Sequence, residues 1–132
     1  MSAMNRSDLQ AWLDRYIEAW RANEREPIEA LFTDDVVYRW RPYLSYPAAH
    51  GIEEVVEGWL GDAKDEPGTW EARYEAYAVD GDRAVATGFS RYVATGSDPE
   101  RTYHNVFLMR LAPDGRCREF TELYMLEEEP QS

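Results

Sequence analysis

Two stretches of the chain carry apolar residues at the three- and four-residue spacing of an amphipathic helix. The apolar positions are Leu9, Trp12, Leu13, Tyr16, Ile17 and Trp20 in the first stretch, and Ile52, Val55, Val56, Trp59 and Leu60 in the second. The first pattern predicts a helix that ends near Asn23, and Ser7 with Gln10 has the form of a capping box at its start. Pro27 suits the first turn of a short helix over 28–32.

After residue 68 the apolar period changes from 3.6 to 2, the spacing of a strand with one buried face. The pattern predicts an early strand over 34–41 and four long ones over about 69–79, 83–95, 101–112 and 116–126. Asp80-Gly81 between two of them indicates a hairpin, because Gly adopts a positive φ without steric cost. Helices therefore precede a meander, and the sequence predicts an α+β fold in which three helices cover one face of a curved antiparallel sheet.

Length and charge narrow the classes of partner. The 132 residues fit one domain over 1–132, with a core of about 7–126. Acidic residues outnumber basic ones by 26 to 14, and a surface with a net charge of −12 repels phosphate backbones and anionic membranes. The sequence therefore predicts no nucleic-acid partner and no membrane partner. The single cysteine, Cys117, has no second cysteine to pair with, and we expect a cytoplasmic location.

Five motifs follow one another in a characteristic order: RY at 15–16, ALFTDDVVY at 30–38, GI at 51–52, AVDGDRAV at 78–85 and DGRCREFTE at 114–122. Their order and spacing resemble the nuclear transport factor 2-like superfamily, in its SnoaL-like branch. The resemblance implies a cone-shaped fold in which a bent sheet wraps around the helices and encloses a pocket. It also implies a homodimer formed through the outer face of the sheet.

The resemblance extends to enzymes of this fold, which include ketosteroid isomerase and the SnoaL polyketide cyclase. Tyr16 falls at the position of the isomerase's oxyanion-hole tyrosine, whereas Trp40 and Phe107 stand where that enzyme has its two carboxyl groups. The cyclase mainly needs one carboxylic acid in an apolar pocket. Glu122 is similar in position to that acid.

Limonene epoxide hydrolase is a third enzyme of this fold, and its catalytic pattern is an Asp–Arg–Asp relay with a water-positioning Tyr and Asn. Tyr38 matches that tyrosine and Glu122 falls at one aspartate of the relay. Trp40 replaces the asparagine, Phe89 replaces the arginine, and Arg91 stands at the position of the other aspartate. The resemblance therefore implies a water-activating relay that lacks one of its carboxylates.

Strand alternation predicts which of these residues share a face, because residues two apart point to the same side. The face expected to point inward carries Phe89, Arg91, Asn105, Phe107, Phe120 and Glu122. A charged side chain among aromatic rings is costly to bury unless it is paired. Either Arg91 and Glu122 form a structural salt bridge, or burial raises the pKa of Glu122 so that it works as an acid or base near neutrality.

The sequence thus predicts a pocket for a small apolar, aromatic or polyketide-like molecule. In the catalytic hypothesis, Glu122 moves a proton, Arg91 stabilises an oxyanion and Tyr38 donates a hydrogen bond in an aldol cyclisation, isomerisation or hydrolysis. The expected ligand-binding residues are Tyr16, Trp20, Trp40, Trp59, Phe89, Asn105, Phe107 and Tyr124. The other hypothesis is a non-catalytic ligand-binding or dimerisation module.

No metal and no cofactor are predicted. His50 and His104 lie far apart in the sequence without a paired spacing, and His104 is expected on the outward face. Phosphate-binding and dinucleotide-binding glycine motifs are absent from the sequence.

Overall fold

In this computed structural model the chain is described over residues 4–39, 43, 49–61, 68–94, 96 and 99–127. These residues form α1 (Arg6–Ala22), α2 (Arg25–Leu31), β1 (Phe32–Arg39), β2 (Ala49–His50), α3 (Ile52–Gly61), β3 (Trp70–Asp80), β4 (Arg83–Tyr92), β5 (Arg101–Leu111) and β6 (Cys117–Leu126). The predicted α+β class, with three helices and a strand meander at the end, is confirmed. The two-residue strand β2 is too short to show any alternation, and the sequence did not predict it.

The strands form one sheet in the order β2-β1-β6-β5-β4-β3. Strands β3 to β6 are the antiparallel meander that the sequence predicted. Strand β1, however, pairs in parallel with β6, with Tyr38 opposite Phe120, so the sheet is mixed and the expectation of an antiparallel sheet is wrong at this pair. A parallel pair needs a long crossover connection, and here the connection includes α3 and the rest of the meander.

Helix α1 begins with a capping box made of Asn5 and Asp8. The Asn5 side-chain oxygen accepts from the Asp8 backbone N–H at 2.9 Å, and the Asp8 carboxylate accepts from the Asn5 N–H at 3.0 Å. The predicted box of Ser7 and Gln10 is therefore wrong, because both lie inside the helix while Asn5 has the extended backbone of an N-cap. The helix ends where predicted, at Asn23, which has a left-handed φ of 53°.

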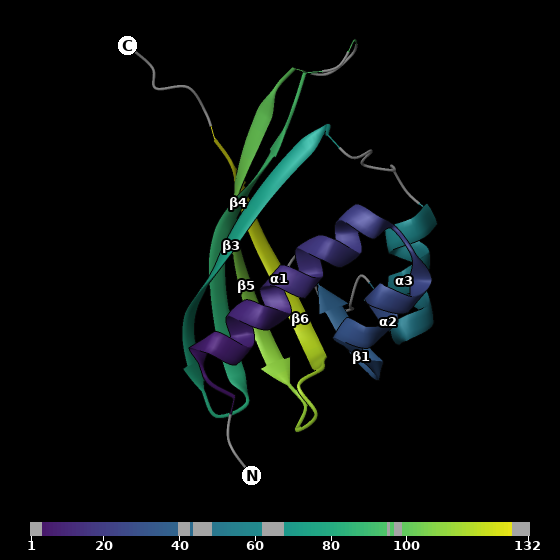
Figure 1. Cartoon of the computed structure of the whole chain (residues 1–132), viewed down its shortest axis with the longest axis vertical. Helices are drawn as coiled ribbons and strands as arrows, with labels where there is room; N and C mark the ends of the chain where they lie inside the picture. The colour runs from purple at the N-terminus through teal and green to yellow at the C-terminus, as the bar shows by residue number, and fades with distance from the viewer. Residues whose placement is uncertain are drawn as a thin grey trace.

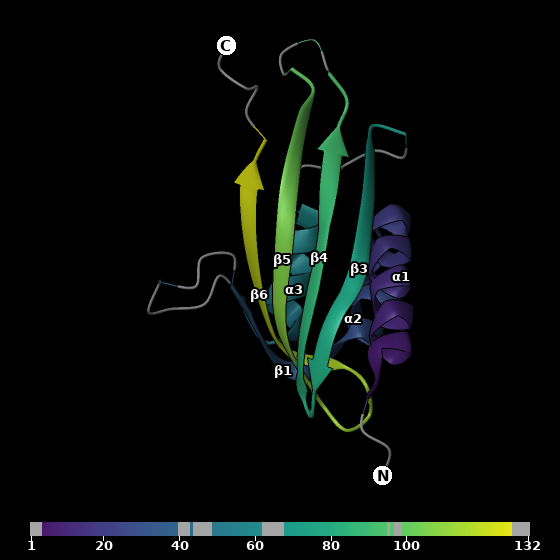
Figure 2. The ribbon, with the colours of Figure 1, turned by 90° about the vertical axis from the view of Figure 1, so that its left-hand side faces the viewer.

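The described helices all lie on one face of the sheet (Figures 1 and 2). Helix α1 runs along β3, and α2 and α3 pack beside β1. In the view of Figure 2, β6, β5, β4 and β3 stand side by side, with α2 and α3 behind them and α1 along the β3 edge at the right. The Trp12 indole of α1 is fully buried, and its Nε1 donates to the Leu31 carbonyl oxygen at 3.0 Å, which ties α1 to the end of α2.

Side chains on the helix-covered face, which we call the inner face, form rows across the strands. From β6 to β4 the successive rows are Phe120, Met109 and Ala84; Glu122, Phe107 and Ala86; and Tyr124, Asn105 and Gly88. Phe120 and Phe107 are fully buried, whereas Tyr124 is 48% exposed. The inner face therefore passes from closed core to an accessible end, and Glu122 lies at the boundary between them.

Candidate functional site

A chain of hydrogen-bonded polar side chains crosses the inner face from β6 to β3. Asn105 Nδ2 donates to Glu122 Oε1 at 3.1 Å, and Asn105 Oδ1 accepts from the Ser90 hydroxyl at 3.3 Å. The Ser90 hydroxyl is also hydrogen bonded to that of Tyr74. Asn105 and Ser90 are each 4% exposed, and Glu122 is partly buried. Buried polar groups in native proteins are hydrogen bonded, and this chain satisfies the polar side chains that the apolar face carries.

Three tyrosines from three different elements lie close enough to Glu122 for its charge to raise their pKa: Tyr16 of α1, Tyr38 of β1 and Tyr74 of β3. A hydrogen bond joins the Tyr16 and Tyr38 side chains. Both rings stack on Phe120, with ring centroids 5.8 Å and 4.8 Å from it. Packing therefore holds these hydroxyl groups in place around the carboxyl.

Burial raises the pKa of Glu122 to about 7, and the hydrogen bond from Asn105 offsets part of that rise. Desolvation dominates because the carboxylate loses water that the surrounding rings do not replace. Burial also raises the pKa of Tyr16, Tyr38 and Tyr74 well above the ordinary value, and the nearby Glu122 charge adds to the effect. The tyrosines therefore remain neutral near neutral pH, while the Glu122 carboxyl is divided between acid and carboxylate.

Arg91 lies outside this cluster, so the predicted Arg91–Glu122 pair is wrong. The Arg91 guanidinium binds Glu100, with Nε 2.6 Å from Oε1, and also approaches Glu71 at 3.6 Å. Its side chain is 46% exposed. Glu122 shares a row with Ala86 of β4, which places Arg91 about 16 Å further along the strand at ~3.3 Å per residue.

The error arises from the face assigned to β4. The inward residues of this strand are Ala84, Ala86, Gly88 and Ser90. Phe89 therefore points outward with Arg91, and its predicted place in the wall around Glu122 is wrong. At position 88 β3 leaves no room for a side chain, because a Cβ there would stand 2.1 Å from the Arg73 carbonyl oxygen and 2.6 Å from Tyr74 Cδ1.

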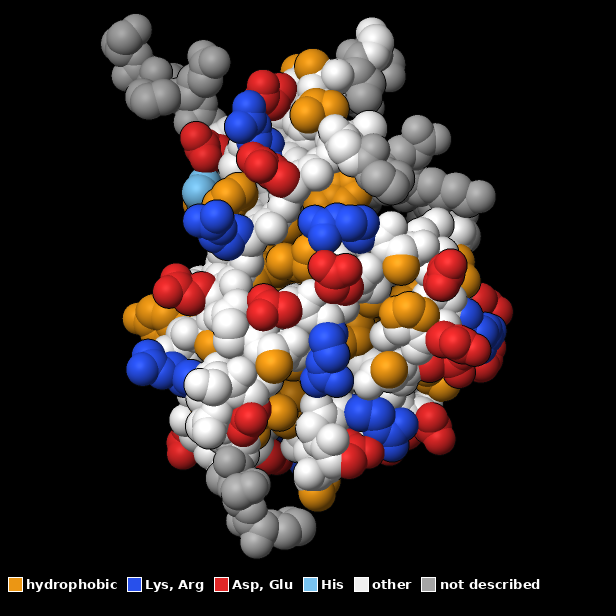
Figure 3. Space-filling view, in the orientation of Figure 1, with side chains coloured by type: hydrophobic (Ala, Val, Ile, Leu, Met, Phe, Trp, Pro, Cys, Tyr) orange, Lys and Arg blue, Asp and Glu red, His pale blue; other side chains and the backbone are white. Residues whose placement is uncertain are grey.

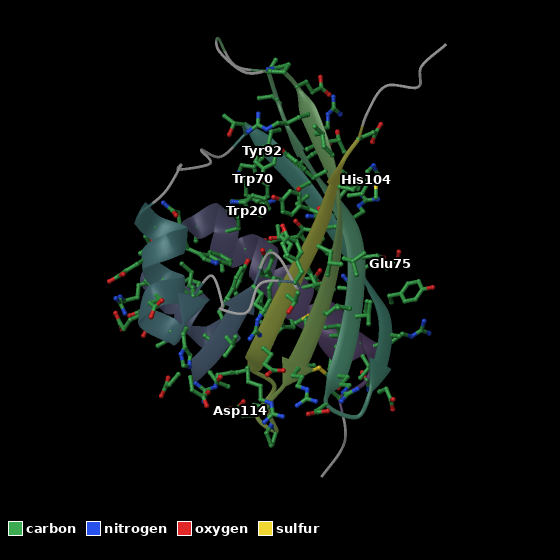
Figure 4. The ribbon with its side chains drawn as sticks, turned by 180° about the vertical axis from the view of Figure 1, so that it is seen from behind. Trp20, Trp70, Glu75, Tyr92, His104 and Asp114 are labelled. Atoms are coloured by element: carbon green, nitrogen blue, oxygen red, sulfur yellow. The ribbon has the colours of Figure 1, made fainter. Side chains whose placement is uncertain are left out.

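The accessible end of the inner face carries an aromatic wall, which we define as Trp20, Trp70, Tyr92, Tyr103 and Tyr124. Trp20 stacks on Trp70 with ring centroids 3.8 Å apart, and Tyr92 lies beside them (Figure 4). Tyr103 makes edge contacts with both Tyr92 and Tyr124. The structure thus brings the predicted Trp20 and Tyr124 to one end of the inner face, next to the polar chain.

The other aromatic residues predicted to bind a ligand lie away from this aromatic wall. Phe107 is fully buried beside Glu122 in the sheet, and Trp59 packs edge-on against Tyr16 with ring centroids 5.3 Å apart. Both contribute to the packed core. Trp40 lies outside the described residues.

Sequence reasoning missed Ser90 and Tyr74. A signal for Ser90 was present, because an isolated glycine within a strand marks a close backbone approach. Gly88 and Ser90 lie two residues apart and so share the crowded face of β4. Tyr74 had no comparable signal, since only its contact with β4 distinguishes it from the other tyrosines of the chain.

The described residues contain no group of three or more His, Cys, Asp or Glu side chains arranged to hold a metal ion. None of the helices in that part of the chain is long and apolar enough to cross a membrane. His104 and Glu75 project away from the aromatic residues labelled in Figure 4. The His104 Nε2 lies 2.7 Å from a Glu127 carboxylate oxygen, and its side chain is exposed.

Comparisons with known proteins concern both sequence and fold. A family model described as a SnoaL-like domain matches residues 13–120. Among similar solved structures is an LEH-like epoxide hydrolase from M. tuberculosis, with a TM-score of 0.64 and 11% sequence identity, covering 90% of this chain and 84% of that one. No curated protein matches the chain. At this identity the structural likeness shows the fold alone.

Proposed function

Because the chain belongs to the SnoaL-like family of the nuclear transport factor 2-like superfamily, we propose that it binds a small, neutral, apolar or aromatic molecule at the inner face of its sheet. In this proposal Glu122 transfers a proton to or from the bound molecule, without a cofactor. The observation that carries the proposal is a partly buried carboxyl with a pKa of about 7, held among tyrosines where the core meets the accessible end of the inner face.

A general acid or base is most effective when its pKa is near the working pH, because it is then present in both protonation states. Glu122 meets this condition through desolvation. Tyr38, already hydrogen bonded to Tyr16, supplies a neutral hydroxyl close to the carboxyl. Hydrogen-bonded hydroxyl groups polarise one another, which suits Tyr38 to stabilise negative charge that develops on a substrate oxygen.

The surroundings of Glu122 favour a neutral, flat ligand. Among the described residues, the arginines that form ion pairs do so with other carboxylates, and none of them pairs with Glu122. Ionised Glu122 would repel an anionic group placed beside it. The face shown in Figure 3 also intersperses its basic side chains with acidic ones. The aromatic wall offers ring faces and edges, which suit an aromatic ligand.

Proton transfer at a carbon acid fits this cluster better than epoxide hydrolysis. The hydrolase relay that the resemblance implies couples two carboxylates through an arginine. In the described part of this chain, the hydrogen-bond partner of the Glu122 carboxyl is the neutral amide of Asn105. A single carboxyl can shuttle a proton between carbon and oxygen, so we favour aldol cyclisation or isomerisation.

For the assembly, the proposal is a homodimer through the outer face of the sheet. No described helix covers that face, which is turned to the viewer in Figure 2. Leu108 of β5 and Met125 of β6 are 43% and 72% exposed, and a second copy of the chain would bury them. Light scattering should give a dimer for the wild type and a monomer for Leu108→Arg, and a monomeric wild type would overturn the proposal.

A cytoplasmic location suits the unpaired Cys117 thiol.

The catalytic proposal can be tested with 2-tetralone, a neutral aromatic ketone whose α-protons exchange with solvent. Exchange into D₂O would be followed by NMR for wild type, Glu122→Gln and Glu119→Gln. The control, Glu119, lies on the outward side of the same strand and pairs with Arg110. Wild type and control should accelerate exchange with a pH inflection near 7, and Glu122→Gln should lose the acceleration by at least about 100-fold.

Equal exchange rates for wild type and Glu122→Gln would contradict the acid–base role. Saturable binding of 2-tetralone to both proteins, with exchange no faster than in buffer, would identify a ligand-binding module that is not an enzyme for this class of carbon acid.

A further inference from the structure

The side chain of Gln10 is hydrogen bonded to the outer edge of β3. Strand β3 is the last strand of the described sheet on this side, and α1 runs along it (Figure 2). Gln10 Nε2 donates to the Tyr74 carbonyl oxygen at 2.9 Å, and Gln10 Oε1 accepts from the Ala76 backbone N–H at 3.0 Å. A backbone carbonyl only accepts and a backbone N–H only donates, so the two partners fix the orientation of the Gln10 amide.

The two hydrogen bonds are those that a residue of a neighbouring strand would make. In a parallel ladder, one residue donates to the carbonyl before a given residue of its neighbour and accepts from the N–H after it. The groups bound to Gln10 flank Glu75 in this way. The Gln10 amide therefore takes the place of one strand residue at a sheet edge, where backbone groups otherwise lack a partner strand.

These bonds lie where the pairing of β3 with β4 is irregular. The register of the two strands shifts between Ala76 and Ala78, directly after the residue whose N–H is bound to Gln10. Such an irregularity locally disrupts a ladder. Gln10 therefore supports β3 from α1 at a point where support from β4 is interrupted.

The segment that Gln10 holds carries part of the Glu122 site. The Tyr74 side chain is 4% exposed, and its ring meets Tyr16 edge-on at a centroid distance of 5.8 Å and Phe107 at 4.7 Å. Phe107 lies opposite Glu122 in the sheet. Helix α1 therefore contacts Tyr74 twice, with Gln10 at its carbonyl and with Tyr16 at its ring.

We propose that Gln10 is a positioning residue of the Glu122 site, whose amide anchors the Tyr74 segment of β3 to α1 and so keeps water from the carboxyl. The described groups that face Glu122 from other elements are all neutral near neutral pH: Tyr16, Tyr38, Tyr74 and Asn105. Protonation of the carboxyl therefore depends on how well these neighbours exclude water. The catalytic part of this inference rests on the proposed function, whereas the anchoring of β3 does not.

The test measures the Glu122 pKa by NMR titration of its carboxyl carbon and the hydrogen exchange of the Ala76 amide, and neither measurement needs a ligand. Gln10→Met keeps the length of the side chain and removes both hydrogen bonds. The Ala76 amide should then exchange at least about 10-fold faster, because the strand edge opens more often. The Glu122 pKa should fall by at least about 0.3 units toward its ordinary value, because water reaches the carboxyl.

The control is Asp14→Asn, which changes the other side chain that Gln10 Nε2 approaches, at 3.3 Å, and should leave both quantities unchanged. In Gln10→Met, a smaller fall of the pKa, no change or a rise would overturn the inference, even if the fold is less stable, because Gln10 would then support the fold without acting on the site. A fall without faster exchange at Ala76 would also overturn it. If Gln10→Met does not fold, Gln10→Asn, which is one methylene too short to bind both groups, decides by the same criteria.

The 2-tetralone exchange profile separates this inference from the proposed function. A lowered NMR pKa in Gln10→Met, with no exchange of 2-tetralone by any of the proteins, refutes the function alone. Exchange by the wild type with an unmoved pKa in Gln10→Met refutes the positioning role alone.

Discussion

The raised pKa of Glu122 makes the stability of the fold depend on pH with a definite sign. Burial raises this pKa from 4.5 to about 7 in the folded protein, while the hydrated carboxyl of the unfolded chain keeps its ordinary value. Between those two values the folded state binds more protons than the unfolded state. The free energy of unfolding contributed by Glu122 therefore falls as the pH rises from about 4.5 to about 7, and it is lowest above that range.

The size of the effect follows from the size of the shift. One pKa unit corresponds to about 1.4 kcal/mol, so ionised Glu122 destabilises the fold by about 3 kcal/mol relative to the protonated form. Glu122→Gln keeps the shape of the side chain and an oxygen that accepts from Asn105 Nδ2, but it cannot ionise. The variant should match wild type at about pH 4 and exceed it by up to about 3 kcal/mol at about pH 8.5.

The assay is urea unfolding followed by tryptophan fluorescence over this pH range, for wild type, Glu122→Gln and Glu119→Gln. The control removes a carboxyl whose partner, Arg110, is 3.5 Å away on the outer face of the sheet. Because exposed ion pairs contribute little, the control should differ from wild type by less than about 1 kcal/mol throughout the range.

A difference between wild type and Glu122→Gln that does not change with pH would refute the reasoning, because it would show that burial does not perturb the carboxyl. A variant that is destabilised by several kcal/mol at high pH would refute it in another way. That result would mean that the carboxylate has a cationic partner, as the Arg91–Glu122 salt bridge required.

Three further predictions concern the fold. Asn5→Ala removes the observed N-cap and should lower the free energy of unfolding by about 1 kcal/mol, whereas Ser7→Ala should change it by less than about 0.5 kcal/mol; equal effects in urea unfolding would contradict the assigned capping box. Gly88→Ala forces a Cβ to within 2.1 Å of the Arg73 carbonyl oxygen and should cost at least about 3 kcal/mol of stability, so a variant as stable as wild type would show that β3 and β4 can separate freely. Cys117 is fully buried and burial raises the pKa of its thiol, so a thiol reagent should label the protein only as fast as it unfolds, and rapid labelling in native buffer would contradict this placement.

The sequence by itself determined the local elements, because their signals depend on residues close together in the chain. The stripe from Leu9 to Trp20 predicted α1 since residues three and four apart share one face of a helix. Asp80-Gly81 predicted the β3–β4 hairpin, and Gly81 has the positive φ of 63° that such a turn uses. The choice of Asn5 over Ser7 as the cap was not determined in this way, since both precede a suitable acceptor by three residues.

The tertiary structure decided which strands pair and which side of each strand faces the helices. Strands β1 and β6 are the first and last strands of the chain, so no local pattern predicts their parallel pairing. Alternation shows that Phe89 and Arg91 share a side of β4, but it does not say which side meets the helices. In the folded protein Ala84, Ala86 and Ser90 are the buried residues of β4, so the opposite side, with Phe89 and Arg91, points outward.

The candidate site also has features that the sequence determined and features that only the tertiary structure decided. Alternation correctly placed Asn105 and Glu122 together on the inner face. The pKa of about 7, however, comes from atoms that α1, β1, β3 and β5 bring around one carboxyl, and the hydrogen-bonded chain from Glu122 through Asn105 and Ser90 to Tyr74 joins four strands. Desolvation and hydrogen bonding depend on neighbours in space, and for Glu122 most of those neighbours are distant in sequence.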